Sequence, residues 1–169
     1  MTMKAAYLLV DMAIVTQWRG LSEDDLIAAL DAEEQKRPDD VAYVDDSWDA
    51  IHFLLCDRTT AQPIEGNALS EAVVGVHWFD EEDEDAAFIA YCQPDDVKRI
   101  HEAVRKIRAD ELPVALEVPA LRAAAVYQAD WFDVEPEWSL ETLMHDFADL
   151  QALYARAAAQ GRAVVVSFL

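Results

Sequence analysis

The chain has 169 residues, of which 53% are hydrophobic, and its 34 acidic and 13 basic side chains give a formal net charge of −21. A domain of this length buries roughly 68–70% of the surface that its unfolded chain exposes, so we predict a single domain over residues 1–169. The charge excludes nucleic acid and anionic membranes as partners and favours a basic protein, attracted over long range and less so in salt. An acidic surface that only maintains solubility, or adapts the protein to salt, is an equally good interpretation.

Membrane insertion and secretion are not expected. The longest apolar runs, 5–10 and 163–166, are far shorter than the ~20 residues of a membrane-spanning helix. The first residues carry a single positive charge, Lys4, and the apolar run stops at Asp11, unlike a secretory signal. We therefore expect a cytoplasmic protein. Its two cysteines fit no metal or redox spacing and are expected to be inert, buried thiols.

Hydrophobic patterning in the first half of the chain predicts one strand and three helices. Residues 5–10 form an apolar run of strand length. Ser22 precedes an acidic first turn and predicts a helix to about residue 34. A second helix begins at Asp46, and a third, capped by Asn67, ends at Gly75. The second helix has one face formed by Trp48, Ile51, His52 and Leu55.

The second half predicts a hairpin, three helices and a last strand. The strands are 76–79, 86–91 and 163–169, and the helices are 94–108, 119–125 and 139–160. This order indicates an α+β fold with a small mixed sheet. We expect the long last helix to pack across a sheet that contains both terminal strands.

Six consecutive acids separate the two strands of the hairpin, namely Asp80, Glu81, Glu82, Asp83, Glu84 and Asp85. Like charges in series repel one another, so this segment is predicted to be a solvated loop. It lacks the central glycine and the alternating spacing of a calcium-binding loop. No metal site and no cofactor are therefore expected.

A second candidate contact region, residues 130–138, interleaves three aromatic side chains with four acids. Aromatic residues in a loop can anchor an interface, while acids set its preference for lysine or arginine. The alternative is a loop that folds back and buries its aromatic rings. The candidate partner-binding residues here are Asp130, Trp131, Asp133, Glu135 and Trp138.

Several blocks of the chain are similar to one known family. They are 46–75, Pro94-Asp95-Asp96-Val97, Ala125-Val126-Tyr127 and 147–166. In their order they resemble the YfbM-like family of small bacterial proteins, a domain of unknown function, over nearly the whole chain. The resemblance implies a fold and no particular activity. The sequence departs from the family pattern at Thr2, Cys56-Asp57 and Gln128, which puts in doubt any family pocket that these positions shape.

Few catalytic motifs are present. The glycines are scattered and form no phosphate-binding loop, and no Gly-x-Ser-x-Gly elbow occurs. A Cys–His nucleophile pair can be neither placed nor excluded from the sequence. Trp48 and His52, one helical turn apart, could line a pocket, although a histidine hydrogen-bonded in the core is the commoner arrangement. We assign no catalytic residue.

Two classes of function remain. The first is a non-catalytic protein-binding module, most concretely an immunity or antitoxin-like inhibitor of a basic, toxin-like bacterial effector. The second is an enzyme or small-ligand-binding protein with a pocket near Trp48 and His52. An α+β fold alone does not decide between them.

Overall fold

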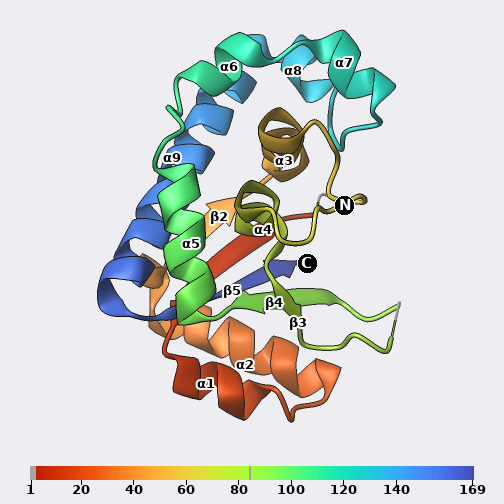
Figure 1. Cartoon of the computed structure of the whole chain (residues 1–169). Helices are drawn as coiled ribbons and strands as arrows, with labels where there is room; N and C mark the ends of the chain where they lie inside the picture. Colours follow the sequence, from red (N-terminus) through yellow and green to blue (C-terminus); the bar gives the residue numbers. More distant parts are fainter. Residues whose placement is uncertain (1–2, 84) are drawn as a thin grey trace.

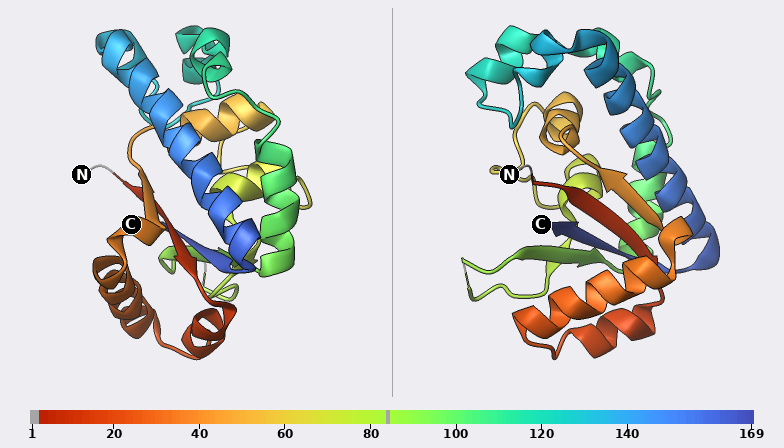
Figure 2. Two further views of the ribbon diagram at one scale, coloured as in Figure 1. Left: turned by 90° about the vertical axis from the view of Figure 1, so that its left-hand side faces the viewer. Right: turned by 180° about the vertical axis from the view of Figure 1, so that it is seen from behind.

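The computed structural model describes residues 3–83 and 85–169, which form one sheet with helices on both faces (Figures 1 and 2). The strands are β1 (Ala5–Val10), β2 (Val41–Val44), β3 (His77–Trp78), β4 (Phe88–Cys92) and β5 (Ala163–Phe168), in the order β2-β1-β5-β4-β3. The predicted α+β class is confirmed. The sheet is antiparallel at each of these pairings and not mixed, because β5 enters between β1 and β4 and runs opposite to both.

The terminal strands β1 and β5 form the centre of the sheet. They pair over their full length, from Ala5 opposite Phe168 to Val10 opposite Ala163, and all residues of both strands are buried. Successive side chains of a strand point to opposite faces. Tyr7 therefore joins the larger hydrophobic cluster and Leu8 the smaller one. Burial on both faces explains the continuous apolar runs at the two ends of the sequence.

Two helices, α1 (Met12–Trp18) and α2 (Glu23–Lys36), cover one face of the sheet (Figure 2). The predicted cap of α2 is confirmed, because the Ser22 Oγ accepts a hydrogen bond from the Asp25 N–H at 3.3 Å. Leu26 and Leu30 point from α2 into the smaller cluster, beneath the sheet. This layer holds β1, β4 and β5 from one side.

The other face is covered by α3 (Trp48–Cys56), α4 (Ala68–Val74), α5 (Pro94–Val104) and α9 (Pro136–Gln160). As predicted, α9 packs across the sheet against β1, β2 and β5. Three short helices, α6 (Glu111–Ala115), α7 (Val118–Ala123) and α8 (Trp131–Val134), gather at the first half of α9 (Figure 1). The buried face of α9 includes Leu143, Phe147, Leu150, Leu153 and Tyr154.

Some elements differ from the sequence-based expectation. Four short ones, α1, β2, α6 and α8, were not predicted, because each has too few residues to show a period. The helix expected to begin at residue 139 begins at Pro136, and the one expected to reach residue 108 ends at Val104. The hairpin strands are 77–78 and 88–92 in place of 76–79 and 86–91.

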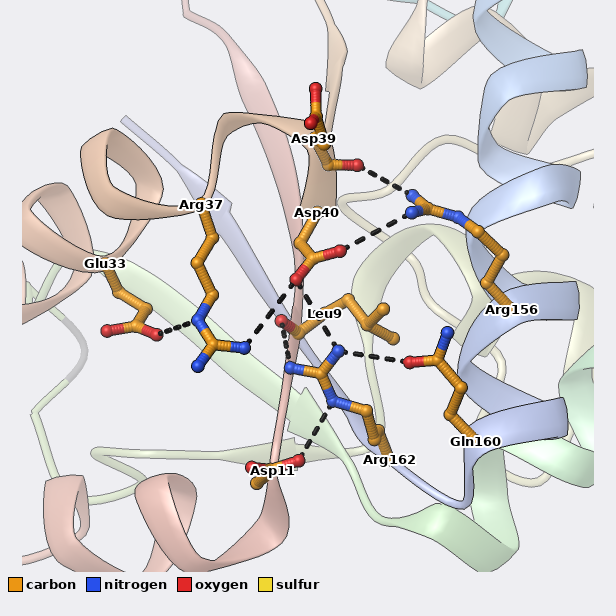
Figure 3. Close-up of polar contacts among 9 residues, drawn as sticks. All are labelled: Leu9, Asp11, Glu33, Arg37, Asp39, Asp40, Arg156, Gln160 and Arg162. Carbon is orange, nitrogen blue, oxygen red and sulfur yellow. Dashed lines mark hydrogen bonds and ion pairs between the residues drawn. The ribbon is translucent and has the colours of Figure 1, made fainter.

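A network of arginines fastens the turn between α9 and β5 (Figure 3). Asp40, in the short helix η1 (Pro38–Asp40), lies 3.4 Å from the Arg156 Nη1 and 3.5 Å from the Arg162 Nη1. Arg162 also donates from Nε to Asp11 at 3.0 Å, and its side chain is only 13% exposed. These contacts join the end of β1, the start of β2 and the start of β5.

Gly75 makes the close approach between α4 and the sheet possible. It ends α4 with φ +80° and ψ −177°, a conformation that is essentially restricted to glycine. A Cβ at this position would lie 2.8 Å from the Cβ of Ala90 in β4. Glycine at this position therefore allows the end of α4 to lie directly against β4.

Replacing Gly75 by Ala is expected to lower the free energy of unfolding by about 1–3 kcal/mol, because the backbone is strained and the new methyl meets Ala90. Gly20→Ala is the matched control, since Gly20 has nothing within 4 Å of an added Cβ and no positive φ. Urea unfolding of both variants measures the difference. Equal stability of the two would contradict the role of Gly75.

Candidate functional site

The side chain of His52 lies in the core and both of its ring nitrogens are hydrogen-bonded. His52 is 0% exposed. Its Nδ1 contacts the carbonyl oxygen of Arg58, which can only accept, so Nδ1 carries the proton. Its Nε2 lies 2.8 Å from the Oγ of Ser70, and that Oγ accepts from the Ile64 N–H at 2.9 Å. The neutral ring satisfies every one of these groups.

A serine paired with a histidine can act as a nucleophile, but here both partners are closed off. Ser70, like His52, is 0% exposed. Burial lowers the pKa of His52, which keeps the ring neutral. The pair therefore ties the segment 58–64 to α3 and α4, and no substrate can reach it without opening the core.

Asp49 is not among the predicted site residues, yet its contact with Tyr127 is the longest-range side-chain hydrogen bond of α3 within the described residues. It is 4% exposed and accepts from the Thr60 N–H at 2.7 Å and from the Tyr127 N–H at 2.8 Å. Its position between Trp48 and Ala50, in a helix whose only other polar side chain is His52, is the sign that the sequence offers. Asp49 joins α3 to the turn after α7.

Trp48 belongs to a row of aromatic rings at one end of the sheet. Tyr127 stacks on Trp48, and Phe168, Phe88 and Trp78 follow at centroid distances of 4.9 to 5.0 Å. Beside the row is a hollow of about 150 Å³, lined in part by Trp48 and Phe168. Sites for drug-sized ligands are about 300–1,000 Å³. The hollow is smaller than that, and His52 does not line it.

The acidic loop is exposed at the end of the β3–β4 hairpin, which extends beyond the neighbouring strands (Figure 1). Asp80 accepts from the N–H groups of Glu82 and Asp83 at 3.1 and 3.2 Å, and Asp83 accepts from the Asp85 N–H at 3.0 Å. Glu81 is also exposed, whereas Glu84 lies outside the described residues. The predicted solvated loop is thus a series of tight turns closed by its own carboxylates.

The second candidate region forms α8 and the start of α9, at the other end of the molecule (Figure 1). Asp130 and Asp133 both pair with Arg122, at 2.6 and 2.9 Å. Trp131 is half-buried, and Trp138 is 64% exposed. Glu135 precedes α9 and is exposed. Arg122 therefore offsets one of these two negative charges, and the exposed aromatic surface of this region comes mainly from Trp138.

A wider groove, of about 700 Å³, runs along the outer edge of β3. Its walls are residues 63–66, the end of α4, β3 with Trp78, Glu81 of the loop and Arg99 of α5. Trp78 is 47% exposed. No sequence pattern connects these segments, because only the fold brings them together.

The two cysteines lie in surroundings that disfavour the thiolate. Burial raises the pKa of Cys56 to about 11 and that of Cys92 to about 12, so both thiols stay protonated. Cys92 is buried as expected, whereas Cys56 is only half-buried.

Within residues 3–83 and 85–169, no three His, Cys, Asp or Glu side chains are arranged to hold a metal ion. None of the helices in these same ranges is long and apolar enough to cross a membrane.

The fold and its buried polar contacts define a small α+β protein with an antiparallel sheet. The family model described as a domain of unknown function (DUF1877) matches residues 1–167, so the chain belongs to this family. The crystal structure of YfbM from Escherichia coli, a protein of unknown function, is similar over 100% of both chains, with a TM-score of 0.69 and 18% identity. That likeness shows a common fold and confirms the resemblance inferred from the sequence. No curated protein matches the chain.

His52→Ala is expected to lower the free energy of unfolding by about 2–4 kcal/mol, because it removes a packed ring and leaves Ser70 with a lost partner. The His52 pKa is lowered from 6.5, so its stabilisation is complete above that pH and is lost as the pH falls. The difference between variant and parent should therefore narrow below about pH 6.5. His145→Ala, at an exposed position on α9, is the control. A stable variant that loses a binding or catalytic activity would instead place His52 in a functional site.

Asp146→Asn is expected to stabilise the protein at neutral pH. Burial, with Asp45 and Asp149 nearby, raises the pKa of Asp146 to about 6, against the hydrogen bond from Ser47 and the charge of His145. The folded state thus binds a proton more tightly than the unfolded chain, and charging Asp146 costs stability as the pH rises through 6. Allowing for solvent screening, the gain is about 1 kcal/mol at pH 7.5.

Thermal unfolding of the Asp146→Asn variant as a function of pH measures this effect. The gain should disappear towards about pH 4, where the carboxyl is protonated in both states. Glu137→Gln, at an exposed position of the same helix, is the control for the loss of one negative charge. A loss of stability in Asp146→Asn at pH 7.5 would contradict the burial argument.

Proposed function

We propose that the protein is a non-catalytic binding module of the cytoplasm that holds a basic protein partner. The observation that supports it best is the β3–β4 hairpin, which presents exposed carboxylates at its tip and an exposed tryptophan, Trp78, at its base. The net charge of −21 draws cationic surfaces towards the molecule. The hairpin therefore combines the negative charge that attracts the partner with an apolar side chain on which the partner can pack.

The shape of the hairpin tip supports a role in contact. The Asp80 and Asp83 carboxylates accept backbone hydrogen bonds within the loop, which favours a defined arrangement over a random one. A defined loop loses less conformational freedom when a partner binds. Charge mainly sets the rate of association, and a buried aromatic side chain mainly sets the rate of dissociation.

The region 130–138 is proposed as a second contact, with a different balance of forces. Arg122 offsets one of the two negative charges of Asp130 and Asp133, so these acids add less to the attraction than the hairpin acids do. Trp138 is 64% exposed and Val134 is 77% exposed. We expect Trp138, together with the half-buried Trp131, to contribute to the lifetime of the complex more than any single acid.

The most concrete role of this kind is an immunity or antitoxin-like inhibitor that covers the active surface of a basic bacterial effector. A small protein with dense negative charge suits such a surface, since complementary charge raises association rates and selects the partner. The alternative of a small-ligand site near Trp48 and His52 receives less support, because the hollow is about 150 Å³ and His52 is enclosed.

Neutralising the six loop acids to Asn and Gln is expected to slow association with the partner by about tenfold at low salt and to flatten the salt dependence, while the fold is kept. The partner is first captured from a bacterial lysate at low and at high salt, and the rates are then measured by surface plasmon resonance. A control with the same net charge neutralises six exposed acids elsewhere, Asp24, Asp31, Asp57, Glu117, Glu141 and Asp149.

The control distinguishes the effect of where the acids lie from the effect of the total net charge. If both sets slow association equally, the overall charge steers the partner and the loop is not a contact. Unchanged kinetics in the loop variant would remove the hairpin from the interface. Capture of no protein at low salt would contradict the proposed function itself.

A further inference from the structure

We propose that the groove along the outer edge of β3 receives a lysine or arginine side chain of the basic partner. The inference rests on the proposed function and adds the chemical group that is recognised and the place that recognises it. The groove has a volume of about 700 Å³, within the range of about 300–1,000 Å³ found for binding sites. A single extended side chain and the backbone that carries it fit such a space.

The sheet topology leaves this groove open. β3 is an edge strand, with β4 on one side only, so its other side faces the groove. The opposite wall is the connection between α3 and α4, at Pro63, Ile64, Glu65 and Gly66. The two walls come from different parts of the chain and are joined at the end of α4, by Val74 and Gly75.

The charge of the groove selects a cation. Glu71 is 5% exposed and is bound by Arg99 through two hydrogen bonds, of 2.9 and 3.2 Å, so these charges compensate each other. Asp96 adds a carboxylate 3.5 Å from Arg99 and 3.0 Å from the Nε2 of His77. Glu65 and Glu81 are exposed and form no ion pair with any described residue. Two carboxylates thus remain for an incoming positive charge.

Trp78 provides the apolar surface that a long basic side chain needs. Its indole is held edge-to-face by Phe88, at a centroid distance of 5.0 Å and an angle of 72°, while 47% of the residue stays exposed. The alkyl stem of lysine or arginine packs on such a ring, and the charged group gains a cation–π contact of about 0.5–1 kcal/mol at an exposed site. A neutral polar side chain gains neither the cation–π contact nor the attraction to the two carboxylates.

Trp138 is the matched comparison on the same molecule. It is more exposed than Trp78, at 64%, and it also follows acidic residues. Arg122 binds the carboxylates of Asp130 and Asp133, whereas Glu135 and Glu137 are exposed and form no ion pair with any described residue. Trp138 thus has acids nearby but does not line the groove. If a cationic probe affects Trp78 but not Trp138, the effect therefore comes from the groove and not from the overall negative charge.

Nuclear magnetic resonance of the ¹⁵N-labelled protein tests whether the groove binds a cationic side chain. The indole N–H signals of Trp78 and Trp138 are assigned with Trp78→Phe and Trp138→Phe variants. The probe is the peptide acetyl-Gly-Gly-Arg-Gly-Gly-amide, and its control carries citrulline, the neutral isostere, in place of arginine. We expect the Trp78 signal to move with the arginine peptide, to move at least about threefold less with citrulline, and the Trp138 signal to stay in place.

Substitutions then locate the contact. The double variant Glu65→Gln and Glu81→Gln should weaken the peptide Kd about threefold to tenfold, and Trp78→Ala by about threefold or more, whereas Trp138→Ala leaves it unchanged. For Trp78→Ala the readout is the backbone signals of Gly66 and Val76 at the groove. The spectra of each variant also report whether the fold is kept, and the Gln variants, at exposed positions, keep the fold.

Three results would overturn the inference: no movement of the Trp78 signal with the arginine peptide, equal movement at Trp138, or equal movement with citrulline. Each is separate from the proposed function. A captured basic partner whose binding is slowed by the loop variant, combined with any of the three, leaves the proposed function in place and removes the groove from it. Movement at Trp78 alone shows that the groove accepts a cationic side chain, whereas a lysate that yields no partner contradicts only the proposed function.

Discussion

The pairing of β1 with β5 is the contact on which the other parts of the fold depend. Residues that lie at opposite ends of the sequence form a six-residue ladder that is buried on both faces. Because β5 also pairs with β4, it joins the β2–β1 half of the sheet to the β4–β3 half. The arginine network at Asp40 and Arg162 fixes the turn that leads into β5 (Figure 3), so the long helix and the last strand are placed together.

A row of aromatic rings that includes the end of β5 links two groups of polar residues with different roles. Phe168, at the end of β5, contacts both Trp48 and Phe88 and so continues the row of rings from the interior to the surface. At the inner end, Asp49 and His52 have their hydrogen-bonding capacity used by the protein itself. At the outer end, Trp78 lies beside carboxylates that are not used in this way. Polar groups that hold the fold and groups open to a partner therefore occupy opposite ends of one aromatic row.

Sequence reasoning found what depends on long apolar periods and missed what depends on packing between distant segments. The terminal strands, the Ser22 cap and the face of α9 were predictable, because the signals are local or repeat over many residues. The antiparallel direction of β5 and the four-residue strand β2 were not, since neither leaves a pattern. The groove at Trp78 combines Glu65, Glu81 and Arg99, which no spacing rule connects. The ion pair between Asp130 and Arg122 also leaves no pattern in the sequence. The sequence therefore overstates how many acids of residues 130–138 are free to bind a partner.

The central position of β5 has a consequence for the synthesis of the chain. A ribosome adds about 5–20 residues each second, and β1, β2 and β4 all emerge before the strand that lies between β1 and β4. Until Phe168 has left the exit tunnel, two inner strands present unpaired backbone edges, which are sites of mispairing with other chains. Dense negative charge on the nascent chain keeps neighbouring copies apart during that interval. The acidity of this protein can thus protect its folding, in addition to the proposed role in attracting a partner.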